Sequence, residues 1–515
     1  MRWLWTLFLP RAWSQEKRGW TPAYVDAIYA MEGALRRANA SDSPTIQRGA
    51  WQHDRAVGEH FSSRDAAQAA GQWRALRDAA AALRYPARAF AGAGVAIVGG
   101  GLRYYGVAEV NARRLRDVGC TLPIELWCLR AEQPTAALRA CRLDPLGVVV
   151  RVADPVAAAL GGGPARRDAF AKRMPATNKR YALKAIALVF CSFEKVLVLD
   201  ADELALRDPT FLLRNQGSVT WPDFWASSHS PAFAAAAFGD AKTALFEGTH
   251  ESGQTVVDKR DAWRSLLPYL FMNLQSTLYY YLTTSGSYGE GDKETLPLAL
   301  EWAKRFLDPP PKWTDVAHKV ASVRPNSPTK PEDSANGMIQ HDLDGRPLFL
   351  HANDPKFSPF DRANGRHNRA PRDWRHWRKG QVAALLVEGG APNASLDLET
   401  WARDALYDLG CSAAFHGYAQ DMLDKKRSEK WTLDRRRTYA SRLPCKLAIH
   451  AESEFGAMTF THDDRDRDGP QPARPGPGDR HLAPTRDLAV PALPLGDGAT
   501  RACHAALEEL EEGAG

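Results

Sequence analysis

The sequence predicts an α/β protein built around a buried, largely parallel sheet. Residues 196–199 are four consecutive apolar residues, as expected of a strand that is covered on both faces. Residues 95–128 read as a strand over 95–98, a glycine loop, a helix from about 105 to 118 and a strand over 124–128, which is a βαβ unit. A helix over 180–190 leads directly into the strand at 196, so the alternation of strands and helices continues.

Length and composition describe an ordinary globular protein with several units. The chain has 515 residues, of which 44% are hydrophobic and 25% are charged. Its formal net charge of +6 is spread over 67 basic and 61 acidic residues, and no Lys/Arg run is longer than the one at 435–437. This mild, dispersed charge argues against a nucleic-acid partner, although it is compatible with an anionic small ligand.

The composition changes along the chain and suggests four units. We expect a helical stem over 1–90, an α/β domain over 91–380, a helical extension over 381–460 and a low-complexity tail over 461–515. The stem is rich in Ala and Arg, and residues 64–83 have helical spacing of apolar side chains. In the tail, residues 463–499 are dense in Asp, Arg, Pro and Gly, so we expect disorder there.

The glycine loop after the first strand is the first candidate binding element. Gly99 and Gly100 let the backbone approach a ligand at the following helix N-terminus, where free N–H groups favour anions. The glycines at 99, 100, 101 and 106 do not match G-x-G-x-x-G, and no Lys follows Gly106. A dinucleotide site and a P-loop are therefore disfavoured.

Two acids follow the buried strand. On an extended backbone residues i and i+2 point to the same side, so Asp200 and Asp202 converge near the carboxyl edge of the sheet, where open α/β sheets bind ligands. Two oxygen donors there suit a Mg²⁺ or Mn²⁺ ion that also binds a diphosphate. The alternative is a pair of loop acids that caps a helix.

Later segments add further candidates. We expect a turn into a short helix at 207–211 and an aromatic strand over 218–225. A small-residue loop at 251–253 should open a further strand, and a turn at 291–295 should follow an aromatic helix. Two more strands are expected around 338–342 and 347–353. Lys184 precedes the acidic pair on the helix over 180–190, while His351 ends a strand and Lys356 follows it. Acids and an imidazole can hold an ion, and lysines can neutralise phosphates.

Each of these residues also has a purely structural interpretation. Lys184 can belong to a solvated helix face, His351 can be a hydrogen-bonded core histidine, and Asp292 can cap a helix. The order of the segments favours a common site, because each one alone is unspecific.

In this order, the segments resemble retaining glycosyltransferases of the GT-A architecture. They look most like the fungal-type Golgi α-mannosyltransferases that extend mannan side chains with α-1,2 or α-1,3 mannose. The resemblance covers about 94–357. It is carried by Gly94–Gly101, Gly119–Trp127, Leu183–Lys184, Leu197–Asp202, Arg207–Phe211, Trp221–Trp225, Glu251–Gln254, Gly291–Thr295, Gly337–Met338 and Leu350–Asn353.

The resemblance implies a Rossmann-like nucleotide-diphospho-sugar transferase domain with a GDP-mannose donor, a Mn²⁺ (or Mg²⁺) ion, a glycan or glycoprotein acceptor and retention of anomeric configuration. The implied metal ligands are Asp200, Asp202 and His351. The implied donor-binding residues are Gly99, Gly100, Lys184, Asp200, Ala201, Asp202, Gly253, Gln254 and Lys356. Glu251, Asp292 and Lys293 are expected in the sugar pocket, with Lys293 paired with Asp292 or with phosphate.

The resemblance also implies the Golgi lumen and a type II membrane anchor. The sequence has no apolar run long enough to cross a bilayer, so we expect either an N-terminus upstream of Met1 or an anchor remnant at residues 3–9. Sequons at Asn39 and Asn393 permit glycosylation in that compartment. None of the seven cysteines forms a C-x-x-C pair, and the three at 120, 128 and 141 can include one disulfide.

Three other functions stay open at this level. A UDP-sugar-dependent retaining glycosyltransferase on the same fold is one alternative, and a catalytically inactive glycan-binding homologue is another. The candidate ligands Asp200, Asp202 and His351 argue against the inactive homologue, since a protein without activity does not need all three. A nucleotide-dependent oxidoreductase is disfavoured by the broken glycine pattern.

Overall fold

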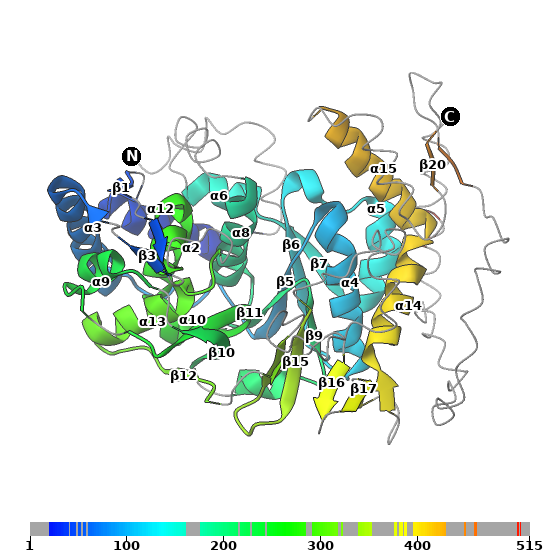
Figure 1. Ribbon diagram of the computed structural model, residues 1–515. Helices are drawn as coiled ribbons and strands as arrows, with labels where there is room; N and C mark the ends of the chain where they lie inside the picture. Colours follow the sequence, from blue (N-terminus) through cyan, green and yellow to red (C-terminus); the bar gives the residue numbers. More distant parts are fainter. Residues whose placement is uncertain are drawn as a thin grey trace, which may run out of the picture.

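A computed structural model of the chain has a central sheet with helices on both faces (Figure 1). It describes residues 20–40, 42–47, 50–52, 55–57, 60–160, 176–214, 217–226, 229–242, 245–284, 291–317, 321–322, 338–352, 375–378, 381–384, 386–388, 395–428, 447–449, 458–460, 502–503 and 505. The expected tail over 463–499, the segment 3–9, and the residues Lys356 and Asn393 lie outside the described residues.

The main sheet confirms the predicted α/β class. Its seven strands run in the order β12-β10-β11-β8-β5-β6-β7. Their bounds are β5 Ala93–Val98, β6 Ile124–Cys128, β7 Val148–Val152, β8 Lys195–Asp200, β10 Ser218–Ala226, β11 Gly248–Asp258 and β12 Trp313–Asp315. Strands β8, β5, β6 and β7 are parallel, whereas β11 runs antiparallel to both of its neighbours.

Strand β8 lies inside this sheet because its sequence can only be buried. Val196 to Leu199 have no exposed surface, and the strand pairs with β5 on one side and β11 on the other. The last β8 residue, Asp200, lies opposite Val98, so the acidic pair and the glycine loop begin at the same edge. The predicted buried strand, and the position of its acidic end at the carboxyl edge of the sheet, are therefore confirmed.

Two helical layers cover the sheet, as Figure 1 shows. The first layer contains α2 Pro22–Arg37, α3 Ser63–Ala82, α6 Asp154–Leu160, α8 Ala176–Phe190, α9 Pro231–Phe238, α10 Lys259–Ala262, α11 Leu266–Leu274, α12 Ser276–Thr283 and α13 Thr295–Phe306. The second contains α4 Gly101–Asp117, α5 Ala136–Leu138, α14 Leu398–Gly410 and α15 Ala413–Ser428. Each layer has its own hydrophobic core against one face of the sheet, and most buried apolar side chains of α14 form a third cluster with the second sheet.

A second, four-stranded sheet brings the end of the domain back to the acidic pair. It has the order β13-β14-β15-β9, with β9 Glu203–Ala205, β13 Ala321–Ser322, β14 Met338–His341 and β15 Pro347–His351. Its antiparallel register places His351 opposite Glu203, directly after the D-x-D segment. The main-chain N–H of Ala352 donates to the carbonyl oxygen of Asp202 at 2.9 Å, which fixes the two segments side by side.

The remaining described elements are short. They are β1 Ile46–Gln47, β2 Ala50–Gln52, β3 Arg55–Val57, β4 His60–Phe61, β16 Arg375–Arg378, β17 Gln381–Ala384, β18 Leu386–Glu388, β19 Ser395–Asp397, β20 Leu447–Ile449, β21 Met458–Phe460, and the single turns at 130–132, 139–143, 144–146 and 210–214. The turn at 210–214 is the predicted short helix.

Two expected boundaries were wrong. Helix α4 begins at Gly101 rather than near residue 105, since Gly101 has φ +65 and turns the chain directly from the strand into the helix. Residues 251–253 are not a loop before a strand, because β11 already begins at Gly248. The strand bulges there: its register against β10 shifts between Val256 and Glu251.

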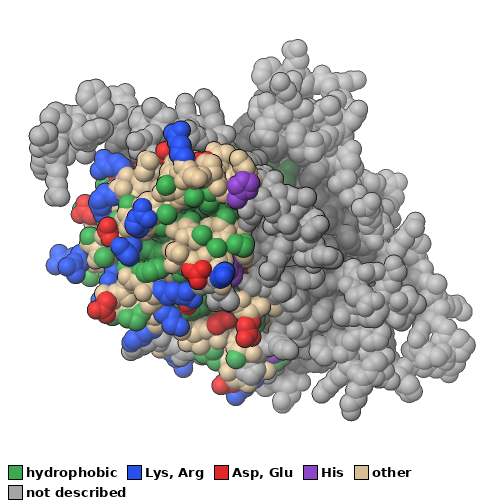
Figure 2. Space-filling model, turned by 60° about the vertical axis from the view of Figure 1, so that its left-hand side comes forward, with side chains coloured by type: hydrophobic (Ala, Val, Ile, Leu, Met, Phe, Trp, Pro, Cys, Tyr) green, Lys and Arg blue, Asp and Glu red, His purple; other side chains and the backbone are tan. Residues whose placement is uncertain are grey.

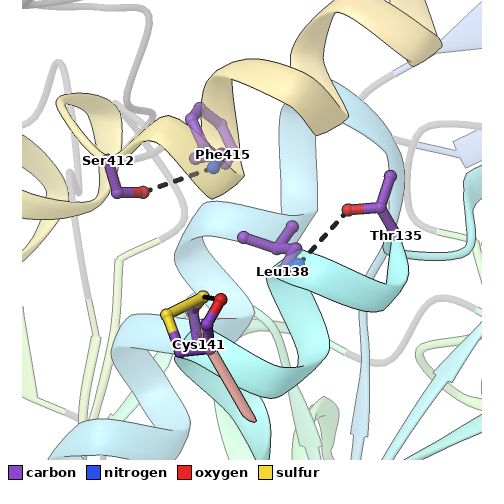
Figure 3. Close-up of a disulfide and its surroundings, with 6 residues drawn as sticks. Thr135, Leu138, Cys141, Ser412 and Phe415 are labelled. Atoms are coloured by element: carbon purple, nitrogen blue, oxygen red, sulfur yellow. Dashed lines mark hydrogen bonds between the residues drawn. A yellow bond between two sulfur atoms is a disulfide. The ribbon is translucent and has the colours of Figure 1, made fainter. Parts of the chain in front are cut away.

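The cysteines at 120, 128 and 141 form no disulfide with one another, although their spacing allowed one. Cys141 bonds to Cys503, 362 residues away, while Cys120 and Cys128 are buried free thiols. Figure 3 shows Cys141 beneath the start of α15, where the Ser412 hydroxyl accepts the main-chain N–H of Phe415 at 3.3 Å and caps that helix. Proximity in the sequence does not indicate the pairing here, because a disulfide requires two cysteines to lie close together in the folded structure.

The N-terminal helices share a core with the sheet. Ile28 and Met31 of α2 and Trp73 of α3 are buried in the hydrophobic cluster that also contains α8, α11 and α13. Over the described part of the face in Figure 2, basic and acidic side chains are interspersed with apolar ones. Among the described residues, no helix is both long enough and apolar enough to span a bilayer. The predicted unit boundaries at 90, 380 and 460 stay predictions.

Candidate functional site

The ends of β8 and β15 bring three metal-ligating side chains together. One ligand atom from each of Asp200, Asp202 and His351 lies within 4.8 Å of the other two. Asp202 and His351 are buried, whereas the Asp200 side chain is 26% exposed. A small ion could therefore be held between the two sheets and still be reached from solvent at Asp200.

The chemistry of this donor set fits a hard divalent cation. Two carboxylates and one imidazole offer oxygen and nitrogen ligands of the kind that Mn²⁺ and Mg²⁺ accept. Neither ring nitrogen of His351 makes a hydrogen bond of good geometry, and Nε2 lies 3.5 Å from Asp202 Oδ1. Burial and the negative charge of Asp202 raise the pKa of Asp200, although the Lys184 ammonium group acts to lower it. A bound cation would relieve this repulsion.

Lys184 connects the acidic pair to the sugar-pocket candidates. Its Nζ lies 2.9 Å and 3.0 Å from the two carboxylate oxygens of Asp200, and 3.3 Å from Asp292 Oδ2. It also donates to the carbonyl and hydroxyl oxygens of Ser252 at 3.0 Å and 3.1 Å. Burial alone lowers the pKa of Lys184, but Asp200 and Asp292 outweigh it and raise that pKa above its ordinary value. Lys184 is thus a buried cation between two carboxylates rather than a solvated helix residue.

The buried carboxylate of Glu251 lies behind His351. Its Oε1 accepts the main-chain N–H groups of Ser252 and Gly253 at 2.9 Å and 2.7 Å, and lies 3.3 Å from His351 Nδ1. Burial raises the pKa of Glu251, but the His351 charge outweighs burial and lowers the pKa to about 2. Burial lowers the pKa of His351, but the nearby carboxylates of Glu251, Asp202 and Glu203 outweigh burial and raise this pKa well above its ordinary value.

The two residues at the start of α13 have different partners from those expected. Asp292 faces Lys184, and burial raises the pKa of its carboxyl to about 6. Lys293 forms an ion pair with the buried carboxylate of Asp223, a partner that the sequence analysis did not name. The N-cap residue of α13 is Glu294, and therefore Asp292 is not the cap.

The glycine loop is packed tightly beside the acidic pair. A Cβ on Gly99 would lie 2.7 Å from the Cβ of Ala108, and one on Gly100 would lie 2.8 Å from the Cβ of Cys128. The same Gly99 position is 3.5 Å from the Cβ of Ala201. These glycines let α4 pack closely on the sheet, and they adjoin the D-x-D segment.

The structure thus brings together most of the predicted site residues. The group around the D-x-D segment comprises Gly99, Lys184, Asp200, Ala201, Asp202, Glu251, Gly253, Gln254, Asp292 and His351. Gly100 is next to it along the loop, Lys293 lies with Asp223, and Lys356 is outside the described residues.

Sequence reasoning missed two acids in this region. Glu203 is fully buried, with Oε2 3.7 Å from His351 Nδ1, and in the favoured amide orientation of Gln254 it accepts two hydrogen bonds from that side chain. Its position directly after the D-x-D segment was a usable signal. Asp223 lies inside the Trp221–Trp225 segment that carries the resemblance, but its partner Lys293 is far away in the sequence.

A separate ionic cluster stabilises the outer strands. His250 of β11 places Nδ1 3.1 Å from Glu294 Oε2 and Nε2 3.2 Å from Asp315 Oδ2 of β12. Burial lowers the pKa of His250, but Asp315 and Glu294 outweigh it and raise the pKa to about 9. This imidazolium joins β11, β12 and the start of α13.

The mixed sheet and the acidic pair at its carboxyl edge define an α/β domain with a candidate metal site. Residues 92–238 and 233–342 match the protein family described as "Mannosyltransferase putative". Through this region the chain is similar to fungal mannosyltransferases.

Several fungal relatives match the same part of the chain. Alpha-1,2-mannosyltransferase MNN21 of Candida albicans is 27% identical over 339 residues, covering 52% of this chain and 51% of the relative. MNN24 of the same organism is 31% identical over 151 residues, covering 22% and 21%. MNN2 of Saccharomyces cerevisiae is 26% identical over 256 residues, covering 42% and 41%. The chain thus spans about half, or less, of the length of these relatives.

Two solved structures are similar at a lower level. The glycosyltransferase GlyE of Streptococcus pneumoniae is 16% identical, with a TM-score of 0.25 over 44% of this chain and 45% of the other. Mouse xyloside xylosyltransferase 1 is 11% identical, with a TM-score of 0.27 over 42% and 83%.

Proposed function

We propose that this chain is a retaining glycosyltransferase that moves mannose from GDP-mannose onto a hydroxyl of a glycan or glycoprotein. The observation that carries the proposal is the convergence of Asp200, Asp202 and His351 at the carboxyl edge of the sheet. The family of residues 92–342 supports mannose as the sugar, because the curated relatives are named as α-1,2-mannosyltransferases.

In this proposal Asp200, Asp202 and His351 hold a Mn²⁺ or Mg²⁺ ion. When bound, such an ion supplies electrostatic stabilisation for the diphosphate leaving group. The ion pair with Lys184 holds the Asp200 carboxylate in place, so that this ligand is oriented before the donor binds. Gly99 and Ala201 lie close together beside the ion site. In this proposal these two small residues form part of the surface that contacts the donor.

Asp292 and Lys293 form the sugar side of the site. Asp292 is buried and shares Lys184 with Asp200, which places it on the same side of the sheet as the ion ligands. A carboxylate can bind two sugar hydroxyls and hold a hexose in one orientation. The Lys293–Asp223 ion pair fixes the turn that carries Asp292.

A screen of nucleotide sugars tests the proposal. The full chain is incubated with Mn²⁺ and each donor in turn, and release of the nucleotide is measured. We expect GDP-mannose to give the fastest release, and Asp202→Ala to abolish most of it while the protein stays folded, because this residue follows the strand end. An Asp202→Ala enzyme with full turnover would refute the metal site.

Donor competition separates the first alternative. If UDP-glucose or UDP-galactose gives faster release than GDP-mannose, the chain is a retaining glycosyltransferase of another donor class. If no donor is turned over but glycans bind, the chain is a catalytically inactive glycan-binding homologue.

The disulfides support the lumen of the secretory pathway, and the Golgi within it, as the location. Cys141 bonds to Cys503, and Cys411 is also disulfide-bonded. Such bonds persist in oxidising compartments and are rare in reducing ones. The sequon residue Asn39 is exposed at the end of α2, where a glycan could be attached. Expression in a eukaryotic host followed by glycosidase treatment tests this: no glycan at Asn39 or Asn393 would argue against the lumen.

A further inference from the structure

We infer that Glu251 is a positioning residue for His351, rather than a group that contacts the sugar. It directs the imidazole so that Nε2 faces the ion site, and it does so through the opposite ring nitrogen. The inference rests on the metal site of the proposed function, and it concerns only residues of this chain.

The contacts of Glu251 leave it little freedom to act on a substrate. Its side chain is 9% exposed. Two main-chain N–H groups, of Ser252 and Gly253, hold Oε1 at 2.9 Å and 2.7 Å. The same oxygen lies 3.3 Å from His351 Nδ1. A carboxylate fixed in this way is oriented before any ligand binds, and it points at the imidazole.

The two ring nitrogens of His351 have different surroundings. Nδ1 faces Glu251, while Nε2 faces Asp202 at 3.5 Å. When Nδ1 carries the proton and donates to Glu251, the Nε2 lone pair points toward the two aspartates and is free to ligate. A carboxylate that accepts the second N–H of a ligating histidine fixes its tautomer and makes the ligand more basic.

Glu203 is the competing candidate for this role, and its geometry is poorer. It lies 3.7 Å from His351 Nδ1, although it stands opposite His351 in the β9–β15 register. Its oxygens are engaged at 3.1 Å and 3.2 Å by the side chain of Gln254 in the favoured amide orientation. Glu203 therefore packs under the imidazole, and Glu251 is the better placed acceptor.

Gly253 makes the close approach possible. A Cβ at this position would lie 2.6 Å from Glu203 Oε2 and 2.9 Å from His351 Nδ1, distances that real Cβ atoms do not adopt. The bulged part of β11 thus places backbone where a side chain would displace the imidazole. This explains why residue 253, two positions after Glu251 and next to the ion site, is a glycine.

The test is Mn²⁺ binding to the full chain, measured by electron paramagnetic resonance without any donor or acceptor. We expect Glu251→Gln to raise the Kd for Mn²⁺ by about 10- to 100-fold, the range for partners of metal-ligating histidines. Glu251→Asp keeps the charge but shortens the reach to Nδ1, so we expect it to weaken binding at least fivefold. Glu203→Gln, the matched control, should change the Kd less than about threefold.

Pulsed electron paramagnetic resonance adds a measurement that would not change if Glu251 only stabilised the fold. The coupling of Mn²⁺ to the imidazole nitrogen should change in Glu251→Gln and stay as in the wild type in Glu203→Gln. If Glu251→Gln does not fold, Glu251→Asp carries the test. Equal Kd values for the wild type and a folded Glu251 variant, or a larger effect of Glu203→Gln, would overturn the inference. Absence of Mn²⁺ binding by the wild type would instead refute the metal site itself.

Discussion

Replacing Lys184 with methionine separates two roles for this residue. The resemblance assigned it to the donor phosphates, whereas the structure places its ammonium group between Asp200 and Asp292 with two further bonds to Ser252. Methionine keeps the length of the side chain but removes the charge. If Lys184 is a structural cation, the variant leaves the buried carboxylate of Asp292 and the partly exposed carboxylate of Asp200 without their common partner.

The expected loss of stability follows from this geometry. Breaking a buried ion pair by removing one partner typically costs about 3–5 kcal/mol, because the other charge stays buried and uncompensated. The Lys184 side chain is 6% exposed, and the Asp292 side chain is 3% exposed, so the full penalty applies to this pair. Because about 1 kcal/mol shifts the Tm of a domain of about 150–250 residues by about 2–4 °C and that of a larger domain by less, a cost of about 4 kcal/mol should lower the Tm by roughly 5–8 °C.

The assay is thermal and urea unfolding of the full chain without ligand, followed by circular dichroism. Lys304→Met, at an exposed position of α13, is the matched control and should change stability by less than about 0.5 kcal/mol. Adding Asp292→Asn to Lys184→Met should recover about 1–2 kcal/mol, because one of the uncompensated charges is removed. A Lys184→Met protein as stable as the wild type, with weaker donor binding, would show that Lys184 is a phosphate ligand instead.

Three further outcomes are expected. The stability that His250 contributes should be fully present below pH 6.5 and be lost as the pH rises through about 9, because its folded pKa lies above its unfolded one. Urea unfolding at a series of pH values should show a loss of up to ~3 kcal/mol in the free energy of unfolding. In His250→Gln this dependence of stability on pH should be much weaker. Asp292→Asn should lower kcat on the order of a hundredfold with nucleotide affinity nearly unchanged, as for a contact strengthened in the transition state, and wild-type kinetics would contradict this. Cys503→Ser should destabilise the chain by about 2–4 kcal/mol and make its C-terminal end cleavable by protease under non-reducing conditions, with Cys120→Ser, which breaks no disulfide, as the comparison.

Much of the fold could be predicted because it depends on local patterns. The run from Val196 to Leu199 has only one stable environment, a strand covered on both faces, and the structure places it inside the sheet. The period of two along a strand then directs Asp200 and Asp202 to the same edge without any knowledge of the partners. The resemblance added His351, whose imidazole the second sheet carries to the two acids.

The errors arose where several distant segments decide one contact. Lys293 lies next to Asp292 in the sequence, and its ion pair with Asp223 of β10 could not be foreseen from spacing. Cys141 has two cysteines nearby in the sequence, yet its partner is Cys503. Such pairings depend on how separate elements pack, and residue spacing does not encode them.

By itself, the sequence determined the α/β class, the buried strand and the edge at which its two acids gather, because hydrophobic patterning and strand periodicity are properties of contiguous residues. Only the tertiary structure decided how those acids are held. It placed Lys184 between Asp200 and Asp292, and it placed Glu251 behind His351. The physical reason is that a buried charge must find its counter-charge from whichever segment packs against it, and that choice is made by the whole fold.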